Sequence, residues 1–224
     1  MATTAAARRP LNRDRIYRAA LDYVDAHGLS ALSLHKLGDA LGVRAMSLYN
    51  HIDGKDDLLA GIVECLWAQI EERARPDPGW RAHLQKTGHT VRDVMREHPA
   101  ASCLMYSQPV LPVPALRVLR SAADILRAAG FTERRAIEAV RVFASYVIGS
   151  TMSELCWTAC GASSDERTRT ANLARALPAD VPPPLFDMAL RMCGECDAGE
   201  TFELGLELML RGLRPGAPGS AEEN

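Results

Sequence analysis

The sequence lacks any uninterrupted apolar stretch that approaches the roughly 20 residues of a membrane-spanning helix. An uncharged stretch, residues 142–153, is bracketed by Arg141 and Glu154. The first ten residues contain alanine and arginine but no apolar signal core. We therefore expect a cytoplasmic protein with no membrane partner, in which the six cysteines stay reduced.

Motifs typical of enzymes are also missing. The sequence has no nucleophile elbow, no glycine-rich phosphate loop and no His-Glu-x-x-His metal motif. A hydrolase would need a cysteine with His83, His89 or His98, and a thiol oxidoreductase would need Cys193 with Cys196. Only the presence of these residue types supports either activity. We therefore expect no enzyme, no catalytic residue, no cofactor and no metal.

The composition is that of an ordinary globular protein. The 224 residues are 47% hydrophobic and 24% charged, which argues against a disordered chain and against a disulfide-dense miniprotein. The formal net charge is −2, but residues 1–55 carry eight Lys/Arg and five Asp/Glu, so the remaining 169 residues carry −5. This asymmetry predicts a small basic module followed by a larger acidic one.

Strict apolar and polar alternation is scarce, whereas apolar residues recur at spacings of three and four, so we expect an all-α protein of about nine helices. Asn12, Ser33 and Thr132 are suited to cap helices, and Gly28 and Gly42 to end them. The expected helices span about 12–28, 33–42, 43–51, 55–73, 80–97, a segment ending at residue 130, 132–160, 185–193 and 200–213.

Prolines and polar stretches divide the chain further. The sequence Pro76-Asp-Pro-Gly79 breaks the helical pattern and is a candidate boundary between the two modules. A loop that contains Pro99, Pro109, Pro112 and Pro114 is expected after the helix at 80–97, and residues 162–184 are expected to form a surface loop. The expected segments are a flexible basic arm (1–11), a small basic module (12–58), a larger acidic module (59–213) and a disordered tail (214–224).

Two short helices between Ser33 and His51 carry the main functional prediction. Leu41-Gly42-Val43 can form a tight turn between them, as in a helix-turn-helix. Leu37, Leu41, Val43, Leu48 and Ile52 can form the inner face, which leaves the other positions of the second helix for a DNA major groove. The candidate DNA-binding residues are His35, Arg44, Ala45, Met46, Ser47, Tyr49, Asn50, His51 and Lys55.

These side chains suit different parts of a duplex. Arg44 can bond to a guanine edge or a phosphate, and Ala45 and Met46 can touch a thymine methyl group. Ser47, Tyr49 and His51 can reach phosphates or bases. A second basic feature precedes them, because residues 1–18 contain five arginines (8, 9, 13, 15 and 18) and a single acidic residue, Asp14. This arm either faces phosphates or is simply a solvated segment.

The segment Leu32-Ser-Leu-His-Lys-Leu-Gly-Asp-Ala-Leu-Gly-Val-Arg-Ala-Met-Ser-Leu-Tyr-Asn-His-Ile52, followed by Lys55 and Leu58-Leu59, resembles the tetracycline-repressor (TetR) family. The resemblance covers residues 12 to about 72, and Leu48-Tyr-Asn-His-Ile52 before Lys55 is its most characteristic piece. It implies that Tyr49, His51 and Lys55 contact the DNA backbone or bases.

A second resemblance, to the tetracycline-repressor type of ligand domain, lies in Gly130-Phe-Thr-Glu133 and Phe202-Glu-Leu-Gly-Leu-Glu-Leu208. It implies a homodimer in which residues 185–193 and 200–213, or 132–160 and 200–213, form a four-helix bundle with the partner. Such a dimer would bind a palindromic operator with half-sites about 34–36 Å apart or a multiple of that distance.

The chain departs from the tetracycline repressors around His98 to Pro109, where the spacing is shorter and no histidine aligns with their magnesium ligand. We therefore do not expect a tetracycline–metal inducer. We expect the small-molecule pocket among the helices from residue 55 to residue 193, within a ligand-binding and dimerisation domain over residues 59–213. The candidate ligand-binding residues are Trp67, Glu71, Thr87, Val91, Met105, Tyr106, Arg141, Ser145 and Met152.

Several of these candidates have a simpler interpretation. Trp67, Met105 and Met152 can be ordinary core residues, and Thr87 a hydroxyl on a helix surface. Arg141 interrupts the apolar helix expected at 132–160, so its charge needs a carboxylate, a ligand acid or solvent. We hypothesise that Arg141 recognises an acidic or carbonyl-bearing ligand, with a salt bridge as the default explanation.

The cysteines leave one alternative open. Cys156 and Cys160 are one helical turn apart, and Cys193 and Cys196 have a C-x-x-C spacing, so the four thiols could bind zinc or sense redox state. Helical positions in a reducing compartment favour free thiols instead. The favoured function is a ligand-responsive repressor, in which the helix at 55–73 connects the DNA end at Lys55 with Trp67 and Glu71.

Overall fold

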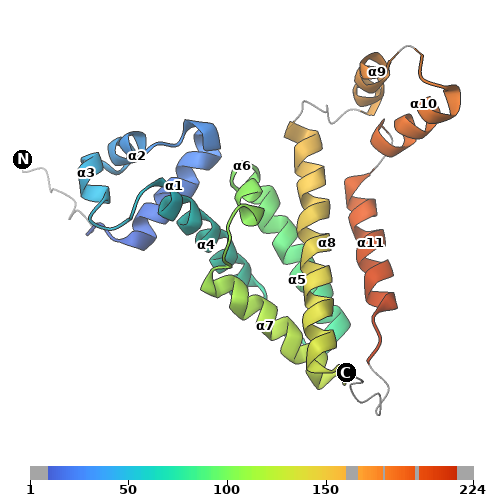
Figure 1. Ribbon diagram of the computed structural model, residues 1–224, viewed down its shortest axis with the longest axis horizontal. Coiled ribbons are helices and arrows are strands. Elements are labelled where there is room, and N and C mark those ends of the chain that lie inside the picture. The colour runs from blue at the N-terminus through green and yellow to red at the C-terminus, as the bar shows by residue number, and fades with distance from the viewer. Residues whose placement is uncertain (1–9, 160–165, 179, 195–196, 216–224) are drawn as a thin grey trace, which may run out of the picture. The chain divides into compact units, whose positions relative to one another are not determined.

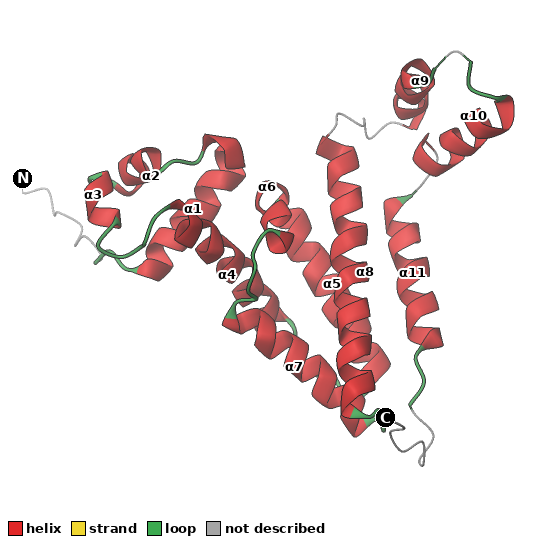
Figure 2. Ribbon diagram, in the orientation of Figure 1, coloured by secondary structure: helices red, strands yellow, loops and turns green. Residues whose placement is uncertain are grey.

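The computed structural model describes residues 10–159, 166–178, 180–194 and 197–215 (Figure 1). Within these residues the chain is all-helical and contains no strand, which confirms the predicted fold class (Figure 2). Among the same residues, every helix is too short or too polar to cross a lipid bilayer.

Eleven α-helices are present in the described residues, two more than the sequence indicated. They are α1 (Arg13–His27), α2 (Leu34–Leu41), α3 (Ala45–Leu48), α4 (Lys55–Arg73), α5 (Trp80–Glu97), α6 (Pro99–Ser102), α7 (Val113–Ala128), α8 (Glu133–Ala159), α9 (Glu166–Ala176), α10 (Pro183–Ala189) and α11 (Ala198–Gly212). Short 3₁₀ turns, η1 (Leu29–Ala31) and η2 (Cys103–Tyr106), follow α1 and α6, and a π turn, η3 (Leu190–Gly194), extends α10.

The described residues group into two compact units. Met1–Ala74 with Glu97–Val118 form the first, here called the N-terminal unit, which contains α1–α4, α6 and the start of α7. Arg75–Arg96 with Leu119–Asn224 form the second, the C-terminal unit, which contains most of α5, the rest of α7 and α8–α11. The segment Glu97–Val118 therefore belongs with the helix-turn-helix although 22 residues of the other unit precede it.

The predicted helix boundaries are confirmed where the chain supplies its own caps. Asn12 accepts the amide of Arg15 at 2.9 Å, and Ser33 accepts that of Lys36 at 3.3 Å. Each cap satisfies an amide that would otherwise lack a partner in the first turn, which contributes about 0.5–2 kcal/mol. Gly28, at φ 83°, ends α1 as predicted.

The core of the N-terminal unit lies between α1 and α4. The predicted stripe of α4, from Leu58 through Ile62 and Leu66 to Ile70, is fully buried, and α1 contributes Ile16, Ala20 and Val24. The two helices approach closely because Gly61 has no side chain, and a Cβ there would fall inside the ring of Tyr17. Burial of each large aliphatic side chain contributes about 1.5–3 kcal/mol.

Two predicted loops were wrong. Pro99 starts α6 inside the proline-rich segment after α5, because proline is well suited to the first turn of a helix. Helix α9 lies inside the predicted surface loop 162–184. Residues 166–176 contain neither glycine nor proline, so the prolines at 178 and 182–184 break the chain only after this helix.

The third helix was predicted over 43–51, but α3 ends at Leu48 and continues as a hydrogen-bonded turn to Ile52.

In the C-terminal unit, α8 and α11 pack side by side (Figure 1). Phe202 of α11 is 1% exposed, and its ring stacks with Tyr146 of α8 at 6.0 Å. The hydroxyl of Tyr146 donates to the carbonyl oxygen of Phe202 at 2.8 Å. The guanidinium of Arg92, on α5, lies 4.7 Å from the centre of the Phe202 ring and pairs with Glu154 at 3.0 Å. Phe202, which lies in the segment that resembles the tetracycline-repressor type of ligand domain, therefore holds α11 against α8.

Candidate nucleic-acid interface and ligand-contact residues

The turn between α2 and α3 has the geometry that its sequence predicts. Gly42 adopts a left-handed conformation with φ 65° and ψ 34°, and the amide of Val43 donates to the carbonyl of Gly38 at 2.9 Å. Gly38 also allows α3 to approach α2, because a Cβ on it would lie 3.0 Å from the carbonyl oxygen of Val43. Two glycines therefore set the angle between the two short helices.

The predicted inner face is partly confirmed. Leu37, Leu48 and Ile52 are at most 1% exposed, whereas Leu41 and Val43 are half-buried at the edge. Three buried side chains thus hold α2 and α3 on the core, and the rest of the turn remains close to solvent.

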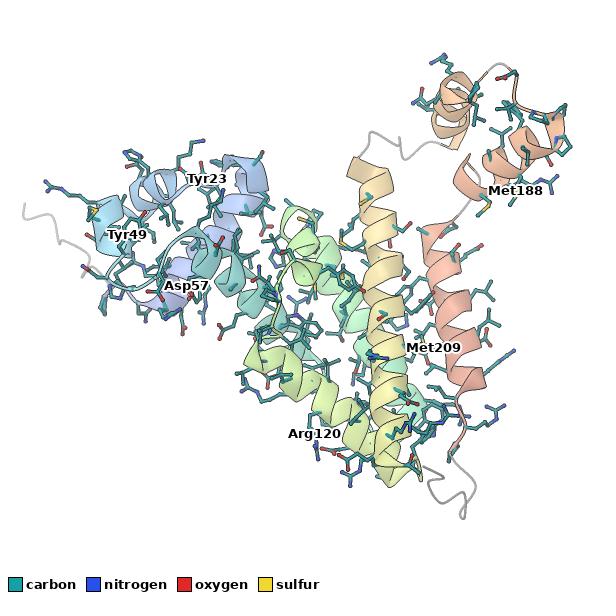
Figure 3. All side chains as sticks on the ribbon, in the orientation of Figure 1. Tyr23, Tyr49, Asp57, Arg120, Met188 and Met209 are labelled. Carbon is teal, nitrogen blue, oxygen red and sulfur yellow. The ribbon has the colours of Figure 1, made fainter. Side chains whose placement is uncertain are left out.

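Most of the candidate DNA-binding side chains lie on the surface. Met46 is 73% exposed and Tyr49 is 51% exposed, although burial of either would be favourable. Figure 3 shows Tyr49 projecting from the α3 segment. The remaining exposed candidates are His35, Arg44, Asn50 and Lys55, and the half-buried ones are Ala45, Ser47 and His51. A short stretch of chain therefore presents basic, polar and apolar groups together.

A hydrogen-bonded cluster fixes the start of α4, where Lys55 lies. Asp57 accepts the guanidinium of Arg13 at 2.5 Å and the hydroxyl of Tyr17 at 2.9 Å. Its second oxygen accepts the backbone amide of Asp53 at 3.0 Å. Burial raises the pKa of Tyr17, so this hydroxyl stays protonated and remains a donor. This cluster could not be found from spacing along the sequence, because Asp57 is 40 or more residues away from Tyr17 and Arg13.

The cluster changes the interpretation of the basic arm. Arg13 was counted among the arginines that face phosphates, but its guanidinium is bound to Asp57 and to the hydroxyl of Tyr17. Arg18 is exposed and Arg15 is half-buried. Arg8 and Arg9 lie outside the described residues. The structure therefore describes only part of the predicted basic arm, and one arginine of that arm, Arg13, forms an ion pair and a hydrogen bond within the protein.

Four ligand-contact candidates belong to the N-terminal unit. Trp67 and Met105 are buried at 3% and 5% exposure, whereas Tyr106 is 58% exposed. Glu71 forms a two-pronged ion pair with Arg117, at 2.5 and 2.9 Å. The hydrogen bond from Arg117 lowers the pKa of Glu71. Glu71 thus has a protein partner already.

Five candidates belong to the C-terminal unit. Thr87 and Val91 are buried on α5, so Thr87 does not lie on a helix surface. On α8, Met152 is half-buried, and Arg141 and Ser145 are exposed. Arg141 is thus open to solvent, and no ion pair with a carboxylate of the described residues is formed. An open depression of about 440 Å³ in this unit is lined by Pro76, Asp77, Pro78, Ile125, Ala128 and Ala129, none of which was predicted.

In the part of the chain that the structure describes, two buried polar atoms have no hydrogen-bond partner: Nε1 of Trp67 and Nδ1 of His83. His83 is 2% exposed, and burial lowers its pKa. The sequence analysis treated His83 only as an enzyme residue. Its spacing of four from Thr87 and eight from Val91 places it on the same buried stripe of α5, and this was the signal that could have found it.

The structure describes only some of the cysteines that the zinc or redox alternative concerns. Cys65 is half-buried, Cys103 and Cys156 are exposed, and none of these three cysteines forms a disulfide. The side chains of Cys160, Cys193 and Cys196 lie outside the described residues. Where side chains are described, no three metal-binding groups gather at one point.

Comparisons with known proteins place the chain in a family. Residues 74–215 match the family described as "Tetracyclin repressor-like, C-terminal domain". A curated HTH-type transcriptional regulator of Saccharopolyspora erythraea is 31% identical over 209 residues, which cover 91% of this chain and 84% of the relative.

Two solved structures from Streptomyces coelicolor have the same fold. A possible TetR family transcriptional regulator is similar with a TM-score of 0.76 and 25% identity, over 90% of this chain and 98% of the other. The TetR family protein ActR in complex with actinorhodin is similar with a TM-score of 0.74 and 25% identity, over 91% and 96% of the two chains. The helix-turn-helix and these similarities define the class of transcriptional regulators. The chain belongs to the tetracycline-repressor (TetR) family.

Proposed function

We propose that this protein is a transcriptional repressor that binds a palindromic operator as a homodimer and is released by a small-molecule inducer. The observation that carries the proposal is the exposure of Met46 on α3 and of Arg44 and Tyr49 at its two ends, while Leu48 of the same helix is fully buried. An apolar and aromatic surface flanked by a cation suits a major groove, where base edges and thymine methyl groups are accessible.

Each DNA-facing side chain has a proposed role. Arg44 binds a guanine edge or a phosphate, and Met46 with Ala45 contacts thymine methyl groups. Tyr49, His51 and Lys55 bind the DNA backbone or bases, and His35, Ser47 and Asn50 supply further polar contacts. Lys55 is suited to a phosphate because it is exposed at the start of α4, where the helix dipole also favours an anion.

The proposed dimer uses α8 and α11. Leu204 and Leu208 are 57% and 61% exposed on α11, and Ile137 and Val142 are 55% and 58% exposed on α8. Because the two helices contact each other, their exposed apolar side chains provide one surface for the same pair of helices of a second copy. The resulting four-helix bundle would hold two recognition helices about 34–36 Å apart, or a multiple of that distance.

The proposed inducer is a small molecule with hydrogen-bond acceptors. The unpartnered Nε1–H of Trp67 is a donor in need of an acceptor, and burial without one costs about 1–3 kcal/mol. In the C-terminal unit, Nδ1 of His83 is likewise buried and has no hydrogen-bond partner among the described residues. ActR, a structural relative, binds actinorhodin. The candidate contacts also include Glu71, Thr87, Val91, Met105, Tyr106, Arg141, Ser145 and Met152.

In functional terms, residues 12–58 are assigned to DNA binding and residues 59–213 to ligand binding and dimerisation. An inducer releases DNA only to the extent that it binds the DNA-incompatible conformation more tightly, and about 5.5 kcal/mol converts a 1:99 mixture to 99:1. Residues 1–9 of the expected arm and 216–224 of the expected tail lie outside the described residues.

Selection from randomised duplex DNA tests the proposal. Wild-type protein should enrich a palindromic sequence, and Met46→Ala should weaken binding to it by about 1–3 kcal/mol through the lost base contact. Met188→Ala is the matched control, since Met188 is an exposed methionine of similar accessibility on α10. Failure to enrich any sequence, or equal binding by Met46→Ala, would contradict the proposed recognition surface.

A further inference from the structure

His98 lies at the junction of α5 and α6 and takes no part in the proposed DNA face or ligand contacts. It follows the last residue of α5, and its carbonyl oxygen starts α6 by accepting the amides of Ala101 at 3.1 Å and Ser102 at 3.0 Å. The hydroxyl of Ser102 donates to the same oxygen at 2.9 Å. The backbone of His98 is therefore part of α6, and its side chain is free to bind elsewhere.

That side chain connects α6 with two helices of the DNA-binding region. Nδ1 of His98 lies 2.6 Å from Oδ2 of Asp25, near the end of α1. Nε2 of His98 lies 3.0 Å from the amide nitrogen of Gln69, on α4. The side chains of His98 and Asp25 are 15% and 27% exposed, so the contact between them is only partly shielded from water.

A further ion pair extends the connection. Arg73 of α4 binds both oxygens of Glu97, at 2.7 and 2.8 Å. Arg73 also donates to the side-chain oxygen of Gln69 at 3.1 Å. A continuous chain of hydrogen bonds thus runs from Glu97 through Arg73, Gln69 and His98 to Asp25, and all five residues belong to the N-terminal unit.

The chain has a defined direction. Arginine only donates hydrogen bonds, so the oxygen of the Gln69 amide accepts from Arg73. The nitrogen of that amide then faces His98 and donates to Nε2, while the oxygen lies farther from Nε2, at 3.3 Å. Nε2 is therefore an acceptor, and Nδ1 carries the proton that is donated to Asp25.

We propose that His98 is a positioning residue for operator binding, which ties the α5–α6 junction to α1 and α4 through this directed chain. Helix α1 contacts α2 of the helix-turn-helix, and α4 begins at Lys55 on the proposed DNA face. Movement of the junction is thereby transmitted to the helices that present the DNA-binding residues. The inference rests on the proposed function, because its effect is read in DNA affinity.

Mutation of the His98–Asp25 pair tests the inference. The variants are His98→Ala, Asp25→Ala, their combination, and Asp25→Asn, which keeps an oxygen that accepts from Nδ1. Asp22→Ala is the matched control, because Asp22 is an exposed aspartate one turn earlier on α1. The measurements are fluorescence anisotropy with the duplex selected by the wild-type protein, at a temperature where circular dichroism shows each variant folded.

Each alanine variant should weaken binding about tenfold, within the usual range of coupling between sites. The double variant should bind no more weakly than either single variant, because both break the same link. Asp25→Asn and Asp22→Ala should remain within about twofold of wild type, since neither removes the link. Additive losses, or alanine variants that bind like wild type, would overturn the inference.

A spectroscopic measurement separates positioning from a general loss of stability. A long-range ¹H–¹⁵N spectrum of the wild-type protein should show His98 protonated on Nδ1, and Asp25→Asn should preserve this tautomer. Protonation on Nε2 alone would overturn the directed chain. If the wild-type protein binds no selected duplex, the proposed function fails first and the positioning role fails with it. If the wild type binds and the variants match it, only the role of His98 fails.

Discussion

The hydroxyl of Tyr17 on α1 lies 2.9 Å from Oδ1 of Asp57 on α4. This contact joins α1 to the first turn of α4, where Lys55 also lies. The same carboxylate also binds Arg13 and the amide of Asp53. Asp57 itself is labelled in Figure 3. Three donors thus converge on one acidic side chain, which holds the segment before α4 in place.

Asp57→Ala should therefore lower the free energy of unfolding by about 1–3 kcal/mol, because it leaves the part-buried hydroxyl of Tyr17 without an acceptor. It should also weaken DNA binding by releasing the segment around Lys55. The measurements are urea unfolding and anisotropy with selected DNA. Asp56→Ala is the control, since Asp56 is exposed in the same turn and its helix-dipole interaction contributes about 0.3–1 kcal/mol. Equal losses in both variants would show that the cluster has no special role.

Gly61→Ala should destabilise the N-terminal unit, because the new Cβ would overlap the ring of Tyr17. Overpacking of this kind costs about 1–3 kcal/mol, well above the small gain from a better helix former. Thermal unfolding measures the effect. Tyr17→Leu combined with Gly61→Ala should be less destabilised than the sum of the two single variants, since leucine lacks the ring. Strict additivity would contradict the proposed overlap.

Cys65 should be the least reactive of the thiols whose side chains are described. Burial raises the pKa of Cys65 from 9.0 to about 11, so the thiolate is scarce at pH 8, whereas Cys103 and Cys156 are exposed. Iodoacetamide labelling with peptide mass spectrometry should modify Cys103 and Cys156 first, and Cys65 only after unfolding.

The same shift in the pKa of Cys65 has a consequence for stability. Above pH 9 the unfolded chain loses this proton while the folded chain keeps it, so the free energy of unfolding should fall as pH rises from 9 towards 11. Cys65→Ala should show a smaller fall across this range. Parallel pH profiles for wild type and variant would contradict the shift.

His83 should make the protein sensitive to acid. Burial lowers the pKa of His83 below its ordinary value of 6.5, so below that pH the unfolded chain binds a proton that the folded chain resists. The free energy of unfolding should therefore fall as pH decreases from 6.5, and His83→Leu should reduce this fall. Urea unfolding at several pH values between 7 and 5 measures it. His89→Leu serves as the control, because His89 is more exposed and lies 3.5 Å from Glu203.

Leu208→Glu should convert the proposed dimer into monomers, because it places a charge in the apolar surface of α8 and α11. Sedimentation velocity would measure the mass, and circular dichroism should show unchanged helix content, since Leu208 is 61% exposed in the protomer. Leu185→Glu is the matched control, as Leu185 is 57% exposed on α10. A wild-type protein that sediments as a monomer would contradict the bundle.

The local features of the helix-turn-helix were predictable from sequence. Ser33 and Gly42 act on amides and carbonyls a few residues away, so their roles as cap and stop follow from residue type and spacing. The buried stripe of α4 follows from helical periodicity in the same way. Helices α6 and α9 were missed because the prolines around them were interpreted as marking loops throughout.

The sequence by itself determined that the chain is helical, where most helices begin and end, and which side of α3 faces outward, because these depend on contacts within a few residues. Tertiary structure decided that Arg13 binds Asp57, that His98 reaches both Asp25 and Gln69, and that His83 is buried without a partner for Nδ1. These depend on which distant residues the packing of helices brings together, and residue spacing carries no such information.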